Sequence, residues 1–131
     1  MSAESGSDDR TLDERAFIDC EQVDGLIGAA GVDGAKEILA AFWRCTDRLL
    51  AVLQDQIARG DLPEAAKTAH SLKGSAMNVG AHRLSVAARS IEEACKALDG
   101  VSAQERLPAA SDHYSQSIGA FEAVFKARRQ A

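Results

Sequence analysis

The sequence predicts an all-α fold, an antiparallel up-down four-helix bundle with a short extra N-terminal helix. Hydrophobic residues recur at spacings of three and four along most of the chain, which is the period of amphipathic helices. The 131 residues contain only 2 prolines and many alanines, a composition that favours helices. No segment has the strict apolar–polar alternation of a half-buried strand. Connections of a few residues then require consecutive helices to run antiparallel.

The N-terminal region divides into an acidic tail and a weak helix. Residues 1–16 are rich in Ser, Asp, Glu and Gly, and they cannot bury enough apolar surface to offset the entropy lost on ordering. We therefore expect a disordered tail over residues 1–16 and a folded domain over residues 17–131. A modest helix is expected over residues 17–30. Glycines at every third position weaken it and fray its end, namely Gly25, Gly28, Gly31 and Gly34.

Two long helices follow. The first is expected to begin at Asp33 or Gly34 and to end at Gly60. Its apolar positions are Ile38, Leu39, Phe42, Trp43, Leu49, Leu50, Leu53 and Ile57. The second is expected to be capped by Asp61 and to end at Gly80. Its predicted buried stripe is Leu62, Ala66, Ala69, Leu72, Ala76 and Val79.

Two further helices complete the predicted bundle. One begins near Ala81 and is expected to end at Gly100. Its apolar seam has the alternating four- and three-residue spacing of a heptad and consists of Leu84, Ala88, Ile91, Cys95 and Leu98. Ser102-Ala-Gln-Glu105 has the pattern of a capping box and is expected to open the last helix. Its inward-facing residues are Leu107, Tyr114, Ile118, Phe121 and Phe125.

Composition excludes several classes of function. The formal net charge of −5 argues against a nucleic-acid binder, which would have a strongly basic face. No apolar stretch approaches the roughly 18–20 residues of a membrane span, and the N-terminus does not resemble a secretory signal, so we expect a cytoplasmic protein without a membrane contact. Cys20, Cys45 and Cys95 form no C-x-x-C pair and are interpreted as small hydrophobic residues in a reducing compartment.

One stretch of the second long helix has the residues for chemistry, AHSLKGSAMNVGAHRL over residues 69–84. On a helical wheel His70 lies about 110° from the centre of the apolar stripe, beside the core and not in it. Gly74, one turn later, lies on the same side. A mid-helix glycine costs about 1 kcal/mol relative to alanine, which the close approach of another molecule would explain. Lys73, at i+3, is near enough to neutralise an oxyanion held on the imidazole.

This stretch resembles the histidine phosphotransfer (HPt) domain of bacterial phosphorelays, whose pattern is roughly H-x-L-K-G-S-x-x-x-x-G-x-x-x-L. The residues that match are His70, Leu72, Lys73, Gly74, Ser75, Gly80 and Leu84. The resemblance implies that His70 is the phosphoacceptor, that Lys73 steadies the phosphoryl group and that Gly74 leaves room for a docking receiver domain. It also implies that Glu92 hydrogen-bonds the ring nitrogen that is not phosphorylated, because many members carry Gln or Glu at this position.

The residues support the same interpretation of Glu92. It lies at the edge of the third long helix's apolar seam, from where it can face His70 across the helix pair. A carboxylate that accepts the Nδ1 proton would fix the tautomer with Nε2 free to attack. The alternative is an ordinary surface carboxylate paired with Lys96 at i+4.

The predicted function is that of a phosphocarrier. His70 would take a phosphoryl group from an aspartate of one receiver domain and pass it to an aspartate of another, so the predicted partners are response-regulator receiver domains and/or a hybrid histidine kinase. No nucleotide-binding glycine motif is present, no cofactor is expected, and Mg²⁺ is expected on the partner receiver only. Whether such a carrier counts as an enzyme stays open. A complete four-helix core predicts a monomer.

Three other interpretations compete with the phosphocarrier. A non-catalytic helical adaptor would use the same face to bind a receiver or another regulator without transfer. A metal or thiol enzyme is disfavoured because no ligand spacing is present. A kinase-dimerisation phosphotransferase is disfavoured because its usual H-E-[LI]-R-T-P context is missing.

Other residues around the stretch have less specific signals. His82 and His113 are expected to be surface residues, and Met77 is either core edge or docking surface. A locally positive rim would steer an acidic partner towards His70, although solvated helix faces explain the same residues equally well. The rim residues are Lys67, Lys73, Arg83, Arg89 and Lys96.

Overall fold

The computed structural model describes the backbone of residues 20–130 and the side chains of residues 25–127. It contains four α-helices: α3 (Cys20–Ala58), α4 (Leu62–Val79), α5 (His82–Lys96) and α6 (Gly100–Gln130). No strand occurs between residues 20 and 130, so the predicted all-α class is confirmed. The expected acidic tail, residues 1–16, lies outside the described residues.

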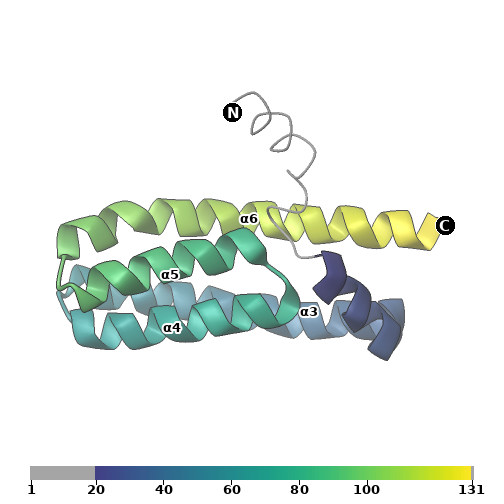
Figure 1. The fold of residues 1–131 in the computed structure, drawn as a ribbon, viewed down its shortest axis with the longest axis horizontal. Coiled ribbons are helices and arrows are strands. Elements are labelled where there is room, and N and C mark those ends of the chain that lie inside the picture. The colour runs from purple at the N-terminus through teal and green to yellow at the C-terminus, as the bar shows by residue number, and fades with distance from the viewer. Residues whose placement is uncertain (1–19, 131) are drawn as a thin grey trace, which may run out of the picture.

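The helices form an antiparallel bundle (Figure 1). Each packs against the helix that follows it in the chain, and α3 also packs against α6, which closes the bundle. The connections cover only residues 59–61, 80–81 and 97–99, so successive helices have no room to run parallel.

The N-terminal part of α3 turns away from the long part of the helix. Gly31 has φ 77° and ψ 170°, a conformation outside the helical region that glycine adopts without steric penalty. The segment before it lies at an angle to the bundle (Figure 1). The predicted short helix and first long helix therefore meet at Gly31, close to the expected start at Asp33.

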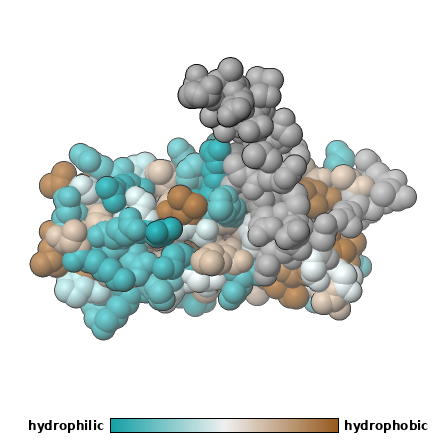
Figure 2. Space-filling view, in the orientation of Figure 1, coloured by the Kyte–Doolittle hydropathy of each residue, from teal (hydrophilic) through white to brown (hydrophobic). Residues whose placement is uncertain are grey.

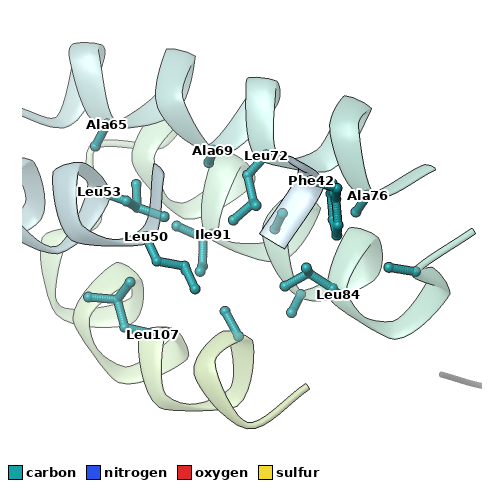
Figure 3. Close-up of a cluster of buried hydrophobic side chains, with 14 of the residues drawn as sticks. Phe42, Leu50, Leu53, Ala65, Ala69, Leu72, Ala76, Leu84, Ile91 and Leu107 are labelled. Atoms are coloured by element: carbon teal, nitrogen blue, oxygen red, sulfur yellow. The ribbon is translucent and has the colours of Figure 1, made fainter. Parts of the chain in front are cut away.

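The core lies where the predicted stripes face one another. All six residues of the stripe predicted for α4 are buried. Side chains from all four helices meet in the interior, and Leu53, Leu72, Leu84 and Ile91 are fully buried there (Figure 3). Small alanines on α4 allow its backbone to approach its neighbours closely, which brings the outer edges of α4 and α5 together as well.

At two of the three turns, a glycine in the left-handed backbone conformation follows the end of the helix, as predicted. Gly60 and Gly80 have φ 76° and 85°, and the Gly80 N–H donates to the carbonyls of Ala76 and Met77. Asp61 lies at the N-cap position of α4, but its side chain makes no capping hydrogen bond, so that part of the prediction is wrong.

The third turn differs from the prediction. α5 ends at Lys96, and Leu98 takes the left-handed position with φ 59°, so its side chain is 68% exposed and does not belong to the seam. Gly100 is the first residue of α6 and not the end of α5.

The capping box predicted at Ser102 is wrong, because the cap lies three residues earlier. The Asp99 carboxylate accepts the Ser102 N–H at 3.0 Å and the Ser102 hydroxyl at 2.7 Å. These hydrogen bonds hold the pKa of Asp99 below its ordinary value, because they stabilise the charged form.

Aromatic residues join α3 to α6. Trp43 packs against Tyr114 and Phe121, with ring centroids 5.7 Å and 5.5 Å away. The Tyr114 hydroxyl lies 3.0 Å from the Trp43 carbonyl and 2.7 Å from Asp47 Oδ1. Burial, together with the Asp47 carboxylate, raises the pKa of Tyr114 well above its ordinary value. Ile38 was expected in the same stripe of α3 but is 45% exposed.

Candidate functional site

The antiparallel packing of α4 on α5 brings together four polar side chains. His70 and Lys73 extend from α4, and Glu92 and Lys96 extend from α5. His70 Nδ1 lies 3.0 Å from Glu92 Oε2, and Lys73 Nζ lies 3.0 Å from Glu92 Oε1. Lys96 Nζ lies 3.0 Å from Oε2, the oxygen that also contacts His70. We call these residues the Glu92 cluster.

Glu92 is the buried centre of this cluster. Its side chain is 4% exposed, whereas that of His70 is 65% exposed. Burial by itself raises the pKa of a carboxyl group, but hydrogen bonds from Lys73, Lys96 and His70 outweigh burial and lower the pKa of Glu92 to about 2. Glu92 is therefore a carboxylate at neutral pH.

The charge of Glu92 determines the tautomer of a neutral His70. A carboxylate has no proton to donate and can only accept hydrogen bonds. The 3.0 Å contact therefore requires that His70 Nδ1 carry the proton. In the neutral ring the lone pair is then on Nε2, on a side chain that is mostly exposed to solvent.

The two lysines give the cluster a positive charge. With a neutral His70, the charges of Lys73, Lys96 and Glu92 sum to +1. The Lys73 side chain is 25% exposed and that of Lys96 is 66% exposed, so Lys73 is the more enclosed of the two cations. An anionic group held at Nε2 would meet this positive charge in a partly desolvated setting.

Gly74 leaves an open surface one turn after His70. A Cβ atom built on Gly74 would have no heavy atom within 4 Å outside its own helical turn and chain neighbours. No neighbouring helix contacts the position of such a Cβ, so the structure gives no packing reason for the helix penalty of Gly74.

A pocket of about 390 Å³ opens beside Lys73, between the C-terminal part of α4 and the N-terminal part of α5. It is lined by Lys73, Met77, Gly80, His82, Ser85, Val86 and Arg89. Met77 and Val86 are 59% and 54% exposed, so two large apolar side chains flank a polar site. The face shown in Figure 2 is mainly hydrophilic over α4 and α5, with hydrophobic residues in small separate groups.

The sequence predicts most residues of this site but not all of them. One interpretation of Glu92 named His70 as its partner and the other named Lys96. Both partners are correct, because the carboxylate contacts both side chains. The surface location is wrong, since Glu92 is buried. Val86 was missed, although an apolar residue off the predicted seam of an amphipathic helix is a usable signal. Met77 is exposed and is not part of the core.

The basic rim is interrupted by acidic neighbours. Lys67 pairs with Glu64, and Arg89 pairs with Glu93, through exposed contacts of 3.1 Å and 3.3 Å. Such exposed pairs contribute little to stability, but they offset the charge of each cation locally. Lys73 and Lys96 instead share one buried carboxylate and keep a net charge.

None of the remaining candidates is among the described contacts of the Glu92 cluster. His82 is exposed as expected, whereas His113 is half-buried. Cys95 is buried, which raises the pKa of its thiol, and Cys45 is half-buried; both are free thiols.

Within the described part of the chain, no three His, Cys, Asp or Glu side chains lie close enough to hold a metal ion. A search of the same residues finds no helix with the length and hydropathy of a membrane span.

Comparisons with known proteins give one family and several similar folds. The family model described as Hpt domain matches residues 37–127. A comparison with curated proteins gives no match. The chain is similar in structure to the histidine-containing phosphotransfer protein MtHPt2 from Medicago truncatula, with a TM-score of 0.79 and 19% identity over 93% of this chain and 86% of that one.

Two further plant structures are similar. Maize ZmHP2, a histidine-containing phosphotransfer protein, has a TM-score of 0.75 and 18% identity, covering 92% of this chain and 91% of its own. A putative histidine-containing phosphotransfer protein from rice has a TM-score of 0.73 and 17% identity, covering 92% of this chain and 88% of its own. At these identities the likeness is one of fold.

Proposed function

The chain belongs to the Hpt domain family and has a phosphotransfer role in a phosphorelay, and on this premise we propose that His70 is the residue that carries the phosphoryl group. The observation that supports this assignment is the contact between His70 Nδ1 and the buried carboxylate of Glu92. It leaves Nε2 of an exposed imidazole as the nucleophile.

The chemistry is a direct exchange between two carriers. Nε2 attacks the phosphorus of an aspartyl phosphate on a receiver domain. The N–P bond forms, the O–P bond breaks, and the aspartate carboxylate leaves with the electron pair. The Nδ1 proton stays on the ring, which becomes cationic, and Glu92 stabilises this charge through the contact already present. Attack by an aspartate of a second receiver reverses these changes.

Lys73 has the role of charge neutraliser. Its ammonium group has three protons and uses one of them on Glu92 Oε1, so it has donors left for the oxygens of a phosphoryl group. Phosphoryl transfer depends mainly on positioning and charge neutralisation, which fits a site of so few groups.

The partners are receiver domains of response regulators and/or of a hybrid histidine kinase. Gly74 provides clearance for a receiver, and Met77 and Val86 offer apolar contacts beside the positive cluster. The Mg²⁺ ion of the reaction belongs to the receiver, and this chain needs no cofactor of its own. A cytoplasmic location is part of this proposal. The bundle is closed by its own four helices, which supports a carrier that works as a monomer.

The test is labelling by a phosphorylated receiver. We expect His70→Gln to abolish an acid-labile, base-stable phosphate while far-UV circular dichroism and the thermal midpoint stay close to wild type, since the side chain is exposed. Labelling of the His70→Gln protein would refute the assignment. A wild-type chain that binds the receiver without becoming labelled would support the helical-adaptor interpretation instead.

A further inference from the structure

We propose that Lys96 is a positioning residue, which holds the Glu92 carboxylate in place against His70 and supplies a positive charge that opposes a second proton on the imidazole. This inference rests on the proposed function of His70. It goes beyond that function because Lys96 lies on the opposite helix and acts through Glu92. Lys96 Nζ and His70 Nδ1 both contact Oε2 at 3.0 Å, whereas Lys73 contacts Oε1.

Lys96 helps to fix the orientation of the Glu92 carboxylate. Each oxygen of Glu92 is held by at least one ammonium group, so rotation of the carboxylate would break contacts on both oxygens. A buried carboxylate without enough donors loses solvation that nothing replaces, and such a group would turn towards solvent. Lys96 therefore helps to retain Oε2 at the position where it accepts the Nδ1 proton.

Lys96 also affects the charge around the His70 imidazole. A carboxylate beside an imidazole favours the protonated ring, and an imidazolium has no lone pair on Nε2. Two ammonium groups oppose this effect. Without Lys96, the charges of Glu92 and Lys73 cancel, and the carboxylate oxygen that faces His70 has no other ammonium partner in the cluster.

No other cation in the described ion pairs takes this place. Lys67 on α4 is paired with Glu64, and Arg89 on α5 is paired with Glu93. The exposed ion pair between Arg59 and Asp55 joins the turn after α3 to the last part of α3, near the start of α4 and away from His70. Among these described ion pairs, Lys96 is the α5 cation that contacts Glu92.

The test uses Lys96→Met, which removes the charge and keeps the aliphatic stem, and Lys96→Arg, which restores a charged donor. The readouts are the ¹⁵N shifts of the His70 ring across pH in the unphosphorylated protein and the rate of labelling by a phosphorylated receiver. In Lys96→Met we expect the ring to gain its second proton at a higher pH than in the wild type, because a nearby positive charge is lost, and we expect labelling at pH 7 to fall about twofold to fivefold. Lys96→Arg should return both readouts to near the wild-type values.

Two controls separate positioning from other effects. Arg59→Met breaks an i,i+4 ion pair away from the site and should change neither readout. In a Glu92→Gln background, Lys96→Met should lower labelling less than it does in the wild-type background, because the carboxylate that Lys96 positions has lost its charge.

The outcomes are distinct. Unchanged ring titration in Lys96→Met, or an equal loss of labelling in the Glu92→Gln background, would refute the inference. The ring titration needs no phosphoryl transfer, so it tests Lys96 even if the wild-type chain fails to be labelled, which would refute the proposed function alone.

Discussion

Glu92 is the residue on which the site depends, because it is a buried anion that three side chains from two helices contact. Burial opposes its ionisation, and the hydrogen bonds from Lys73, Lys96 and His70 lower its pKa from 4.5 to about 2. A carboxyl group with a lowered pKa in the folded state contributes stability that is complete above its unfolded value. That contribution is lost as pH falls towards the folded value.

The first prediction is therefore a stability loss between about pH 5 and pH 2 that depends on Glu92. Urea unfolding of the wild type should show a decline on the order of a few kcal/mol in this window, beyond the decline in Glu92→Gln, which has no charge to lose. The comparison concerns the slopes, because the two proteins differ in stability at neutral pH. Parallel curves across the window would contradict the role of Glu92 as a buried anion.

A second prediction concerns Lys73. In Lys73→Ala the chain should fold, and the rate of phosphoryl acceptance should fall about tenfold, because a donor to developing negative charge is lost. Groups of this type contribute roughly 2–4 kcal/mol when water is excluded, and Lys73 is partly exposed, which reduces the effect. Rapid-quench labelling measures the rate. A rate equal to that of wild type would make Lys73 only a partner of Glu92.

At the scale of the residue, the sequence predicts a contact correctly where the positions of the two residues on their helices determine it. The wheel angle of His70 and the seam-edge position of Glu92 allowed the two side chains to face each other, with a surface carboxylate paired with Lys96 left open as the alternative, and the two side chains lie in contact. The burial of Glu92 and the sharing of one oxygen with Lys96 could not be predicted, because they depend on the distance between α4 and α5 and on rotamers that the pattern does not contain.

At the scale of the helix, Gly74 is a weak point of α4 that packing does not require. The third prediction is that Gly74→Ala raises stability by up to about 1 kcal/mol, because no neighbouring atom opposes a Cβ and alanine favours the helix. Transfer from a receiver should nevertheless fall, and fall further in Gly74→Gln. A displacement of about 1 Å costs on the order of a hundredfold in an aligned attack.

The measurement is paired. Thermal midpoints and transfer rates are compared for the wild type and both Gly74 variants. A gain in stability with a loss of rate supports clearance for a receiver, whereas a loss of both would mean that Gly74 serves the packing of the bundle.

Helix bodies were predicted more accurately than helix ends. The apolar stripe of α4 was predicted residue by residue because periodicity is read over many turns. The end of α5 was wrong for a local reason. Leu98 fits the seam by spacing, but it occupies the left-handed turn position that glycine usually takes, and the neighbouring Asp99 competes with Ser102 as a cap.

At the scale of the molecule, the buried core stabilises the fold, and one polar face holds the candidate site. The four helices share a continuous interior, and the site lies at the outer edge of the α4–α5 pair, where it contributes little to the core. Family membership and the up-down bundle were both predictable, since a dense motif and clear periodicity point to the same fold. A chain with such a closed core is expected to unfold as one unit.

The last prediction tests whether the bundle unfolds as one cooperative unit. It concerns Tyr114, which joins α6 to α3 away from His70. Tyr114→Phe removes the hydroxyl that contacts the Trp43 carbonyl and the Asp47 carboxylate. We expect a loss of about 1–2 kcal/mol, since one contact is to a charged group and Asp47 remains solvated without it. Trp43 is the only tryptophan of the chain, so its fluorescence reports the α3–α6 contact, whereas far-UV circular dichroism reports all helices.

In the wild type and in Tyr114→Phe, the two signals should give the same urea midpoint and should move to lower urea together. Labelling by a phosphorylated receiver, measured well below the midpoint, should stay at the wild-type rate because the Glu92 cluster lies on α4 and α5. Separate midpoints for fluorescence and circular dichroism would contradict a single cooperative core, because α3 and α6 would then open before the α4–α5 pair that holds the site.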